Sequence, residues 1–261
     1  MDSKYFQGVF YRKNKFKKGR KTLFFIHGMT SGSYAWKDYF KTFSKDYNLI
    51  ALDLRGHGKS NRYLKYEDYA IEKFSEDIFR IFKKEKLKDT ILISHSYGNF
   101  VSFSFLWDHQ NLVKKVVFIS VSYKLPRKRV TKLLSYALRI NPAYKITNKK
   151  QPSEVDYSHY LNTGDFNLRR IYADISNTGF ASFAFALRNL LDIDFYPFLY
   201  KIKIPTLIIH GKKDKIFSYK DAVKISKTIE GSKLVIVNKA DHTLVLNNVS
   251  DLYKEIKEFS K

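Results

Sequence analysis

The chain has 261 residues, 44 % of them hydrophobic, which predicts one globular domain with a large core. It contains no cysteine, which excludes disulfides, a thiol nucleophile and thiolate metal sites. No apolar stretch approaches the roughly 20 residues of a membrane span. The first residues also lack the apolar core of a signal peptide, so we expect a cytoplasmic protein.

The formal net charge of +23 has two interpretations. Lysines are spread along the whole chain, which predicts a solvated surface and no nucleic-acid partner. The alternative is weak association with an anionic membrane surface through two denser basic clusters. The first cluster contains Lys13, Lys15, Lys17, Lys18, Arg20 and Lys21, and the second contains Lys124, Arg127, Lys128, Arg129 and Lys132.

The predicted elements begin with a small antiparallel hairpin formed by residues 6–11 and 14–18. Apolar runs then alternate with amphipathic segments, the pattern of a parallel sheet flanked by helices. One helix is predicted from apolar residues at three-to-four spacing, and another follows Ser250, which is placed to cap it. The predicted strands span 23–26, 48–53, 90–94, 115–120, 206–210 and 233–237. The helical residues are Ile71, Phe74, Ile78, Ile81 and Phe82, then Leu252, Ile256 and Phe259.

The segment Ser94-His95-Ser96-Tyr97-Gly98 joins the strand 90–94 to a predicted helix. This layout is typical of a nucleophile elbow, in which a strained turn presents the serine hydroxyl at the edge of the sheet. Small residues two before and two after the serine allow the strand and the helix to approach closely. The first is Ser94, where the usual pattern has glycine. The segment predicts Ser96 as a nucleophile.

A base and an acid follow at suitable strand ends. Asp214 comes shortly after the strand 206–210, and His242 comes shortly after the strand 233–237. In a parallel sheet all three residues gather at the carboxyl edge. The chain order Ser96, Asp214, His242 is that of the α/β-hydrolase catalytic triad.

The chain therefore resembles the α/β-hydrolase fold family, in particular its small esterase, lipase and lysophospholipase-like members. Two further segments match: Leu23-Phe24-Phe25-Ile26-His27-Gly28-Met29, and Leu52-Asp53-Leu54-Arg55-Gly56-His57-Gly58-Lys59-Ser60. The resemblance implies an α/β fold with a mostly parallel central sheet flanked by helices. It also implies an oxyanion hole formed by the backbone N–H groups of Met29 and Tyr97.

The long connection after the sixth strand is where this family inserts a helical cap. We expect residues 1–122 and 199–261 to form the core and 123–198 to form the cap. Apolar residues in this segment predict short amphipathic helices that either wall an apolar acyl pocket or merely pack on the core. They are Leu133, Leu134, Tyr136, Ala137, Leu138, Phe180, Phe183, Phe185, Leu187, Leu190 and Leu191.

The expected chemistry is ester hydrolysis through an acyl intermediate on Ser96, with His242 as base and Asp214 orienting it. The expected substrate is a small-molecule ester with an apolar acyl group, for which a monoacylglycerol and a lysophospholipid are candidates. Thioesterase, aminopeptidase, C–C hydrolase and perhydrolase activities on the same triad remain alternatives, as does a non-catalytic binding protein. A serine at the elbow argues against an epoxide hydrolase or a haloalkane dehalogenase, which use aspartate there.

The other titratable residues are not expected to take part in the chemistry, and no metal or cofactor is expected. Asp241 is adjacent to His242 in sequence, a poor position from which to orient it. His27 and His210 should satisfy local backbone groups, and the turn should direct His95 away from the site. His57 is expected to be structural, and His109 and His159 to be surface or cap residues.

Overall fold

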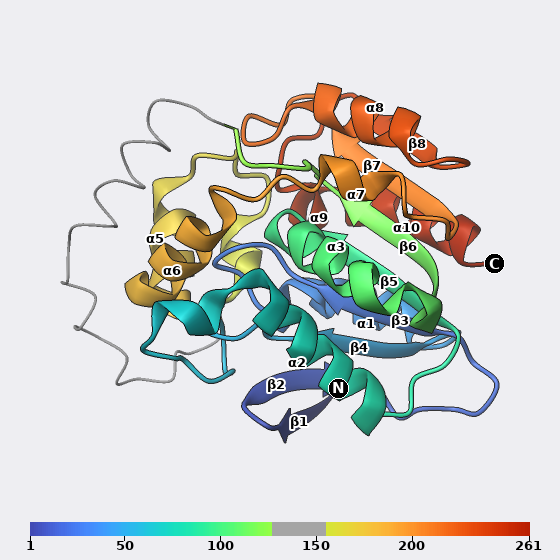
Figure 1. The fold of residues 1–261 in the computed structure, drawn as a ribbon, viewed down its shortest axis with the longest axis horizontal. Coiled ribbons are helices and arrows are strands. Elements are labelled where there is room, and N and C mark those ends of the chain that lie inside the picture. Colours follow the sequence, from blue (N-terminus) through green and yellow to red (C-terminus); the bar gives the residue numbers. More distant parts are fainter. Residues whose placement is uncertain (127–154) are drawn as a thin grey trace.

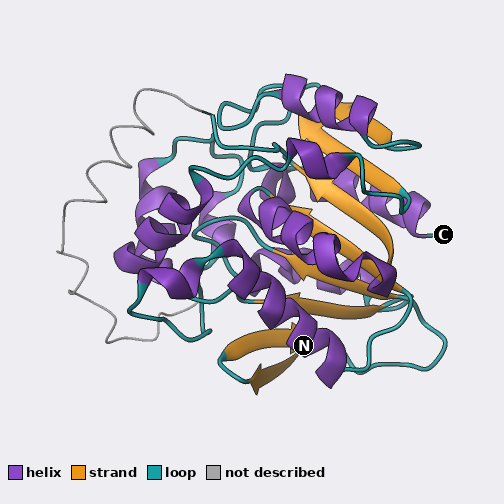
Figure 2. Cartoon of the chain, viewed as in Figure 1, coloured by secondary structure: helices purple, strands orange, loops and turns teal. Residues whose placement is uncertain are grey.

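In the described structure eight strands form a single sheet in the order β1-β2-β4-β3-β5-β6-β7-β8 (Figures 1 and 2). Strand β2 pairs antiparallel with both β1 and β4, and the remaining neighbours in the sheet pair in parallel. The structure is a computed structural model that describes residues 1–126 and 155–261. The strands are β1 Asp2–Phe6, β2 Val9–Lys13, β3 Thr22–Ile26, β4 Asn48–Leu52, β5 Thr90–His95, β6 Val113–Ile119, β7 Thr206–Gly211 and β8 Lys233–Val237.

Helices cover both faces of the sheet, because successive strand side chains point to opposite faces. Phe24, Leu92 and Phe118 belong to the core beneath α2, α3 and α8, whereas Phe25 and Ile93 belong to the core beneath α1 and α10. The helices are α1 Lys37–Phe43, α2 Ile71–Lys84, α3 Tyr97–His109, α5 Leu168–Thr178, α6 Phe180–Leu190, α7 Tyr196–Leu199, α8 Tyr219–Thr228, α9 Leu244–Asn247 and α10 Val249–Ser260. The predicted parallel strands and the helix at Ile71 are confirmed to within about two residues.

Two sequence predictions about the ends of the chain are wrong. The hairpin turns at Gln7 and Gly8, where both residues have positive φ, so the strands are β1 and β2 and residues 14–18 form a loop. The last helix begins at Val249, with Asn248 at its N-cap position, so Ser250 lies inside the helix and does not cap it.

The connection between β6 and β7 contributes α5 and α6, which lie side by side at one end of the sheet (Figure 1). α6 packs against α2 and against the short 3-10 helix Tyr66–Tyr69. Within this connection, Arg127 to Lys132 of the second basic cluster and Leu133 to Leu138 lie outside the described residues. In the described ranges, every helix is too short or too polar to serve as a membrane span.

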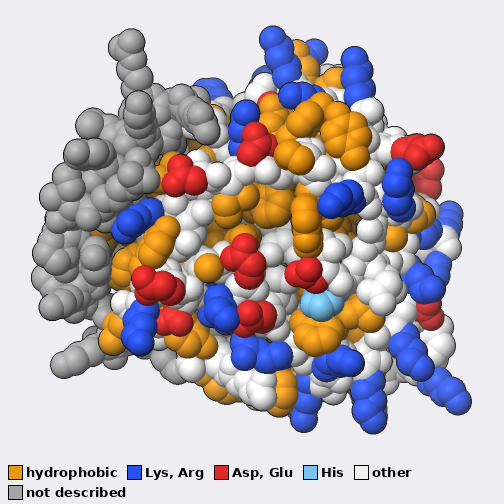
Figure 3. All heavy atoms as spheres, in the orientation of Figure 1, with side chains coloured by type: hydrophobic (Ala, Val, Ile, Leu, Met, Phe, Trp, Pro, Cys, Tyr) orange, Lys and Arg blue, Asp and Glu red, His pale blue; other side chains and the backbone are white. Residues whose placement is uncertain are grey.

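The visible face in Figure 3 shows Lys and Arg side chains spread between acidic and apolar ones, without a single basic patch. The interpretation of the net charge as a solvated surface stays a prediction.

Candidate active site

Ser96 occupies a sharp turn between β5 and α3, with φ 53° and ψ −117°. A non-glycine residue with positive φ is strained, and such strain is typical of functional sites. The turn also requires Gly98, because a Cβ there would lie 2.6 Å from the carbonyl oxygen of His27. α3 can therefore begin close to the sheet, directly after β5. The turn then presents the Ser96 hydroxyl at the carboxyl edge of the sheet.

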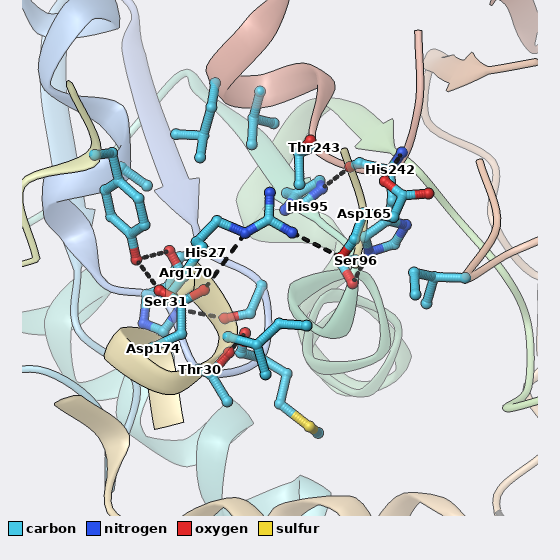
Figure 4. A pocket seen from close by; sticks show the side chains of 18 of the residues that line it. His27, Thr30, Ser31, His95, Ser96, Asp165, Arg170, Asp174, His242 and Thr243 are labelled. Carbon is cyan, nitrogen blue, oxygen red and sulfur yellow. Dashed lines mark hydrogen bonds and ion pairs between the residues drawn. The ribbon is translucent and has the colours of Figure 1, made fainter. Parts of the chain in front are cut away.

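His242 connects the other two predicted triad residues. Its Nε2 lies 2.7 Å from Oγ of Ser96 (Figure 4). Its Nδ1 lies 2.8 Å from Oδ2 of Asp214. A carboxylate can only accept, so Nδ1 carries the imidazole proton and Nε2 accepts from the serine hydroxyl. The structure thus brings Ser96, His242 and Asp214 together in the geometry that a serine nucleophile needs.

Asp214 is fully buried and surrounded by donors. Its Oδ1 accepts from the backbone N–H groups of Ile216 and Phe217, both at 2.8 Å. Burial raises the pKa of the Asp214 carboxyl, but hydrogen bonds from His210 and His242 outweigh this effect, and the pKa lies well below its usual range. Asp214 is therefore ionised at neutral pH, as the orienting acid must be.

His210 has a fixed tautomer beside this carboxylate. Its Nδ1 accepts a hydrogen bond from the backbone N–H of Val121 at 3.1 Å, so its proton is on Nε2. That nitrogen lies 3.3 Å from Oδ2 of Asp214 and 3.3 Å from the carbonyl oxygen of Phe217. The expected contact with backbone groups is present, and the approach to Asp214 adds a second donor to the acid.

Asp165, which is not among the predicted site residues, supports the backbone of His242. Its Oδ1 accepts from the backbone N–H of His242 at 2.8 Å, and its Oδ2 accepts from the backbone N–H of Lys215 at 2.9 Å. Asp165 therefore connects the loop before α5, through hydrogen bonds, to the loops that contain His242 and Asp214. No sequence pattern marks it, because its partners are distant in sequence.

Two cavities meet at Ser96 and Met29. The larger, of about 380 Å³, also borders His242, and the smaller is about 260 Å³. Polar residues along the larger cavity include Ser31, Tyr157, Asp165, Arg170 and Asp174, several of which are drawn in Figure 4. The smaller is lined mainly by apolar side chains, namely Met29, Tyr97, Phe100, Leu125, Pro126, Phe166, Leu187, Leu190, Ile216 and Phe217.

A model of the α/β hydrolase fold family matches residues 21–249. The chain belongs to this family. It is 22 % identical over 259 residues to epoxide hydrolase 1 of Caenorhabditis elegans, covering 91 % of this chain but only 64 % of that relative. It is 26 % identical over 253 residues to the pimeloyl-[acyl-carrier protein] methyl ester esterase of Wigglesworthia glossinidia brevipalpis, covering 93 % of this chain and 95 % of the esterase.

Solved structures agree on the fold. The enol-lactonase from Burkholderia xenovorans LB400 matches with a TM-score of 0.79 at 17 % sequence identity, covering 99 % of each chain. At this identity the match shows that the two chains share the α/β-hydrolase fold. The activity of this member of the family has to be argued from its own site.

The two predicted oxyanion donors of this α/β hydrolase both lie beside the nucleophile. Tyr97 is the first residue of α3, directly after Ser96, and Met29 borders both cavities with Ser96. The backbone at Gly28 passes so close that a Cβ there would lie 3.2 Å from Cβ of Ser96. Both positions suit a backbone donor to a substrate oxygen bound at Ser96.

The prediction that His95 points away from the site is wrong. Its Nε2 donates to the carbonyl oxygen of His242 at 2.9 Å, and the two rings lie 5.2 Å apart. The pleat of β5 places His95 on the same face as Ile93, which is the face that the His242 loop covers. Burial lowers the pKa of His95 to about 3, so its imidazole is neutral and holds the His242 backbone.

The remaining residues have other hydrogen-bond or ring partners than the side chains of Ser96 and His242 in the described structure. Asp241 accepts from the backbone N–H of Thr243 at 2.9 Å and from its hydroxyl at 2.8 Å. His27 donates to the carbonyl oxygen of Gly28 and accepts from the backbone N–H of Leu54. His57 donates to the carbonyl oxygen of Arg55. His109 stacks on Phe79, and His159 lies at the surface near Asp156. In the described part of the chain, no three His, Asp or Glu side chains gather as metal ligands.

Proposed function

We propose that this α/β hydrolase cleaves carboxylic esters through an acyl intermediate on Ser96. The observation that carries the proposal is the pair of contacts made by His242, 2.7 Å to Ser96 Oγ and 2.8 Å to Asp214 Oδ2. A serine hydroxyl is a weak nucleophile at neutral pH, and a neutral imidazole in this position removes its proton as the hydroxyl attacks.

The proposed reaction has two halves. Ser96 Oγ attacks the ester carbonyl, and its proton passes to Nε2 of His242. The tetrahedral oxyanion accepts hydrogen bonds from the N–H groups of Met29 and Tyr97, each worth about 3–4 kcal/mol in the transition state. His242 then donates the proton to the departing alcohol. Water, deprotonated by the same imidazole, attacks the acyl group. His242 then returns this proton to Ser96 Oγ as the acid is released.

Asp214 favours this reaction because it holds the His242 proton on Nδ1 and stabilises the imidazolium that forms. The apolar lining of the smaller cavity suits an apolar acyl group. An epoxide-opening activity is less compatible with the site, because that branch of the family uses an elbow aspartate and this chain has Ser96 there.

The proposal is tested with a fluorophosphonate probe and intact-mass measurement. Wild type should gain one adduct, Ser96→Ala should gain none, and His242→Ala should react far more slowly. Ser250→Ala is the control, since this serine is exposed on α10 and should not change labelling. A folded wild-type protein that takes no adduct would overturn the proposal and favour a non-catalytic binding protein.

A further inference from the structure

Arg170 borders the larger cavity, and one of its guanidinium nitrogens is buried without a hydrogen-bond partner in the described structure. This α5 residue has a side chain only 6 % exposed, yet it borders the cavity that contains Ser96 and His242. Its Nη2 donates to the carbonyl oxygen of Asp165 at 2.9 Å, while among the described residues its Nη1 has no hydrogen-bond partner. Buried guanidinium N–H groups are normally paired, because leaving one unpaired costs its full desolvation penalty.

Asp174 is an incompletely satisfied acceptor one helical turn away. Its Oδ1 accepts from the hydroxyl of Tyr157 at 3.0 Å, and that hydroxyl lies 3.1 Å from Oγ of Ser31. Its Oδ2 lies 3.9 Å from Nε of Arg170, which is too far for a hydrogen bond. Burial raises the pKa of Asp174 to about 7, the behaviour of a carboxyl that lacks strong compensation. Figure 4 shows Arg170 between Asp174 on one side and Asp165 and Ser96 on the other.

The balance of charge around Arg170 argues against an anionic ligand. Two carboxyl groups, Asp165 and Asp174, border the same cavity as this single guanidinium, so the cavity carries no excess positive charge to attract a carboxylate or phosphate. A neutral hydroxyl suits both unsatisfied groups, because it accepts a hydrogen bond from a guanidinium and donates one to a carboxylate.

We infer that the larger cavity binds a hydroxylated part of the ester, held by Arg170 and Asp174, while the apolar part occupies the smaller cavity. Ser96 lies where the two cavities meet, so the two parts of an ester bound there extend in different directions. The substrate class is then an ester with one polyol-like and one apolar side. This inference rests on the proposed esterase function and adds which part of the substrate is recognised.

The test compares esters that differ in their hydroxyl groups. On the alcohol side we compare glyceryl monobutyrate with propyl butyrate, and on the acyl side methyl ω-hydroxyhexanoate with methyl heptanoate. Wild type should prefer the hydroxylated member of at least one pair by about tenfold or more in kcat/KM, since a site built to bond a hydroxyl discriminates against its absence.

Three variants locate the preference. Arg170→Met and Asp174→Leu should each reduce the ratio within the preferred pair to near unity. Arg169→Met, at the exposed neighbouring position, should keep it. The ratio is the decisive readout, because Arg170 also holds the Asp165 carbonyl and a purely structural role would slow both members of a pair alike.

Three results would overturn the inference: no hydroxyl preference in wild type, a preference that survives in both variants, or a stronger preference for the anionic ester monomethyl adipate. A failure of the underlying esterase proposal has a different signature, since Ser96 would then take no fluorophosphonate and none of the esters would be cleaved.

Discussion

The hydroxyl of Ser94 donates a hydrogen bond to Oδ1 of Asn99 over 2.8 Å, inside the elbow and fully buried. The amide nitrogen of Asn99 in turn donates to the carbonyl oxygens of Ile119 and Ser120, at 2.9 and 3.3 Å. The serine that replaces the usual elbow glycine is therefore part of a network that links β5, α3 and the end of β6. Its side chain is accommodated because it has a partner.

We expect Ser94→Ala to lower the free energy of unfolding by about 1–3 kcal/mol, because it leaves Oδ1 of Asn99 buried without a donor. The matched control is Ser102→Ala on α3, the helix that carries Asn99, because the buried hydroxyl of Ser102 has no hydrogen-bond partner in the described structure. Equilibrium urea unfolding measures both. Equal effects of the two substitutions would show that the Ser94–Asn99 bond contributes nothing to stability.

Asp214→Asn should reduce kcat for ester hydrolysis on the order of a thousand- to ten-thousand-fold, because an amide in place of the carboxylate favours the wrong tautomer of His242. Asp241→Asn is the control beside the same histidine, since Asp241 bonds Thr243, and it should stay within a few-fold of wild type. Steady-state kinetics on one ester compare the two variants. A larger loss in Asp241→Asn would reassign the acid.

The gathering of Ser96, Asp214 and His242 could be predicted because each follows a strand of a parallel sheet, so their positions depend on a repeating pattern. Asp165 and Arg170 could not be predicted. They come from the irregular connection after β6, and Asp165 lies 77 positions from the histidine that it holds. His95 was misplaced because its direction depends on the pleat of β5, which the turn alone does not determine.

In the connection after β6, too, the sequence pattern predicts the helices but not how their side chains pack. Its apolar residues were expected either to wall a pocket or to pack on the core, and both occur. Phe183, Leu187 and Leu190 line the cavities, whereas Phe185 is buried against the core and Phe180 is exposed. Amphipathic spacing predicts helices, but it does not determine which surface each side chain meets. That the whole of 123–198 acts as a cap stays a prediction.

The buried ion pair between Arg55 and Asp77 should be important for stability. Nε and Nη2 of Arg55 each donate to the Asp77 carboxylate over 2.8 Å, and both side chains are almost fully buried. Asp77→Ala leaves a buried guanidinium without its counter-charge and should cost about 3–5 kcal/mol in urea unfolding. Glu76→Ala removes the exposed pair with Lys73 and should cost less than about 1 kcal/mol. If Asp77→Ala cost as little as Glu76→Ala, the buried Arg55–Asp77 pair would contribute no more to stability than the exposed pair.

Stability should fall as the pH drops from about 6.5 towards 4, because three buried histidines resist protonation. Burial lowers the pKa of His27 to about 4 and the pKa values of His57 and His95 to about 3. Between these pKa values and pH 6.5, the three histidines are protonated in the unfolded chain but stay neutral in the folded chain. Lowering the pH therefore favours unfolding. Three carboxyl groups act in the opposite direction and offset part of this loss. Burial raises the pKa of Asp174 to about 7, and burial also raises the pKa values of Asp53 and Asp165.

His57→Asn tests the cause of this loss. The amide can still donate to the carbonyl oxygen of Arg55 but cannot bind a proton, so the variant should lose less stability than wild type between pH 6.5 and 4. Urea unfolding at several pH values measures the slopes. His159→Asn changes a surface histidine whose side chain is 77 % exposed and should leave the wild-type slope intact. If His57→Asn and His159→Asn gave the same slope, His57 would not be a source of the acid sensitivity, which would then come from other groups such as His27 and His95.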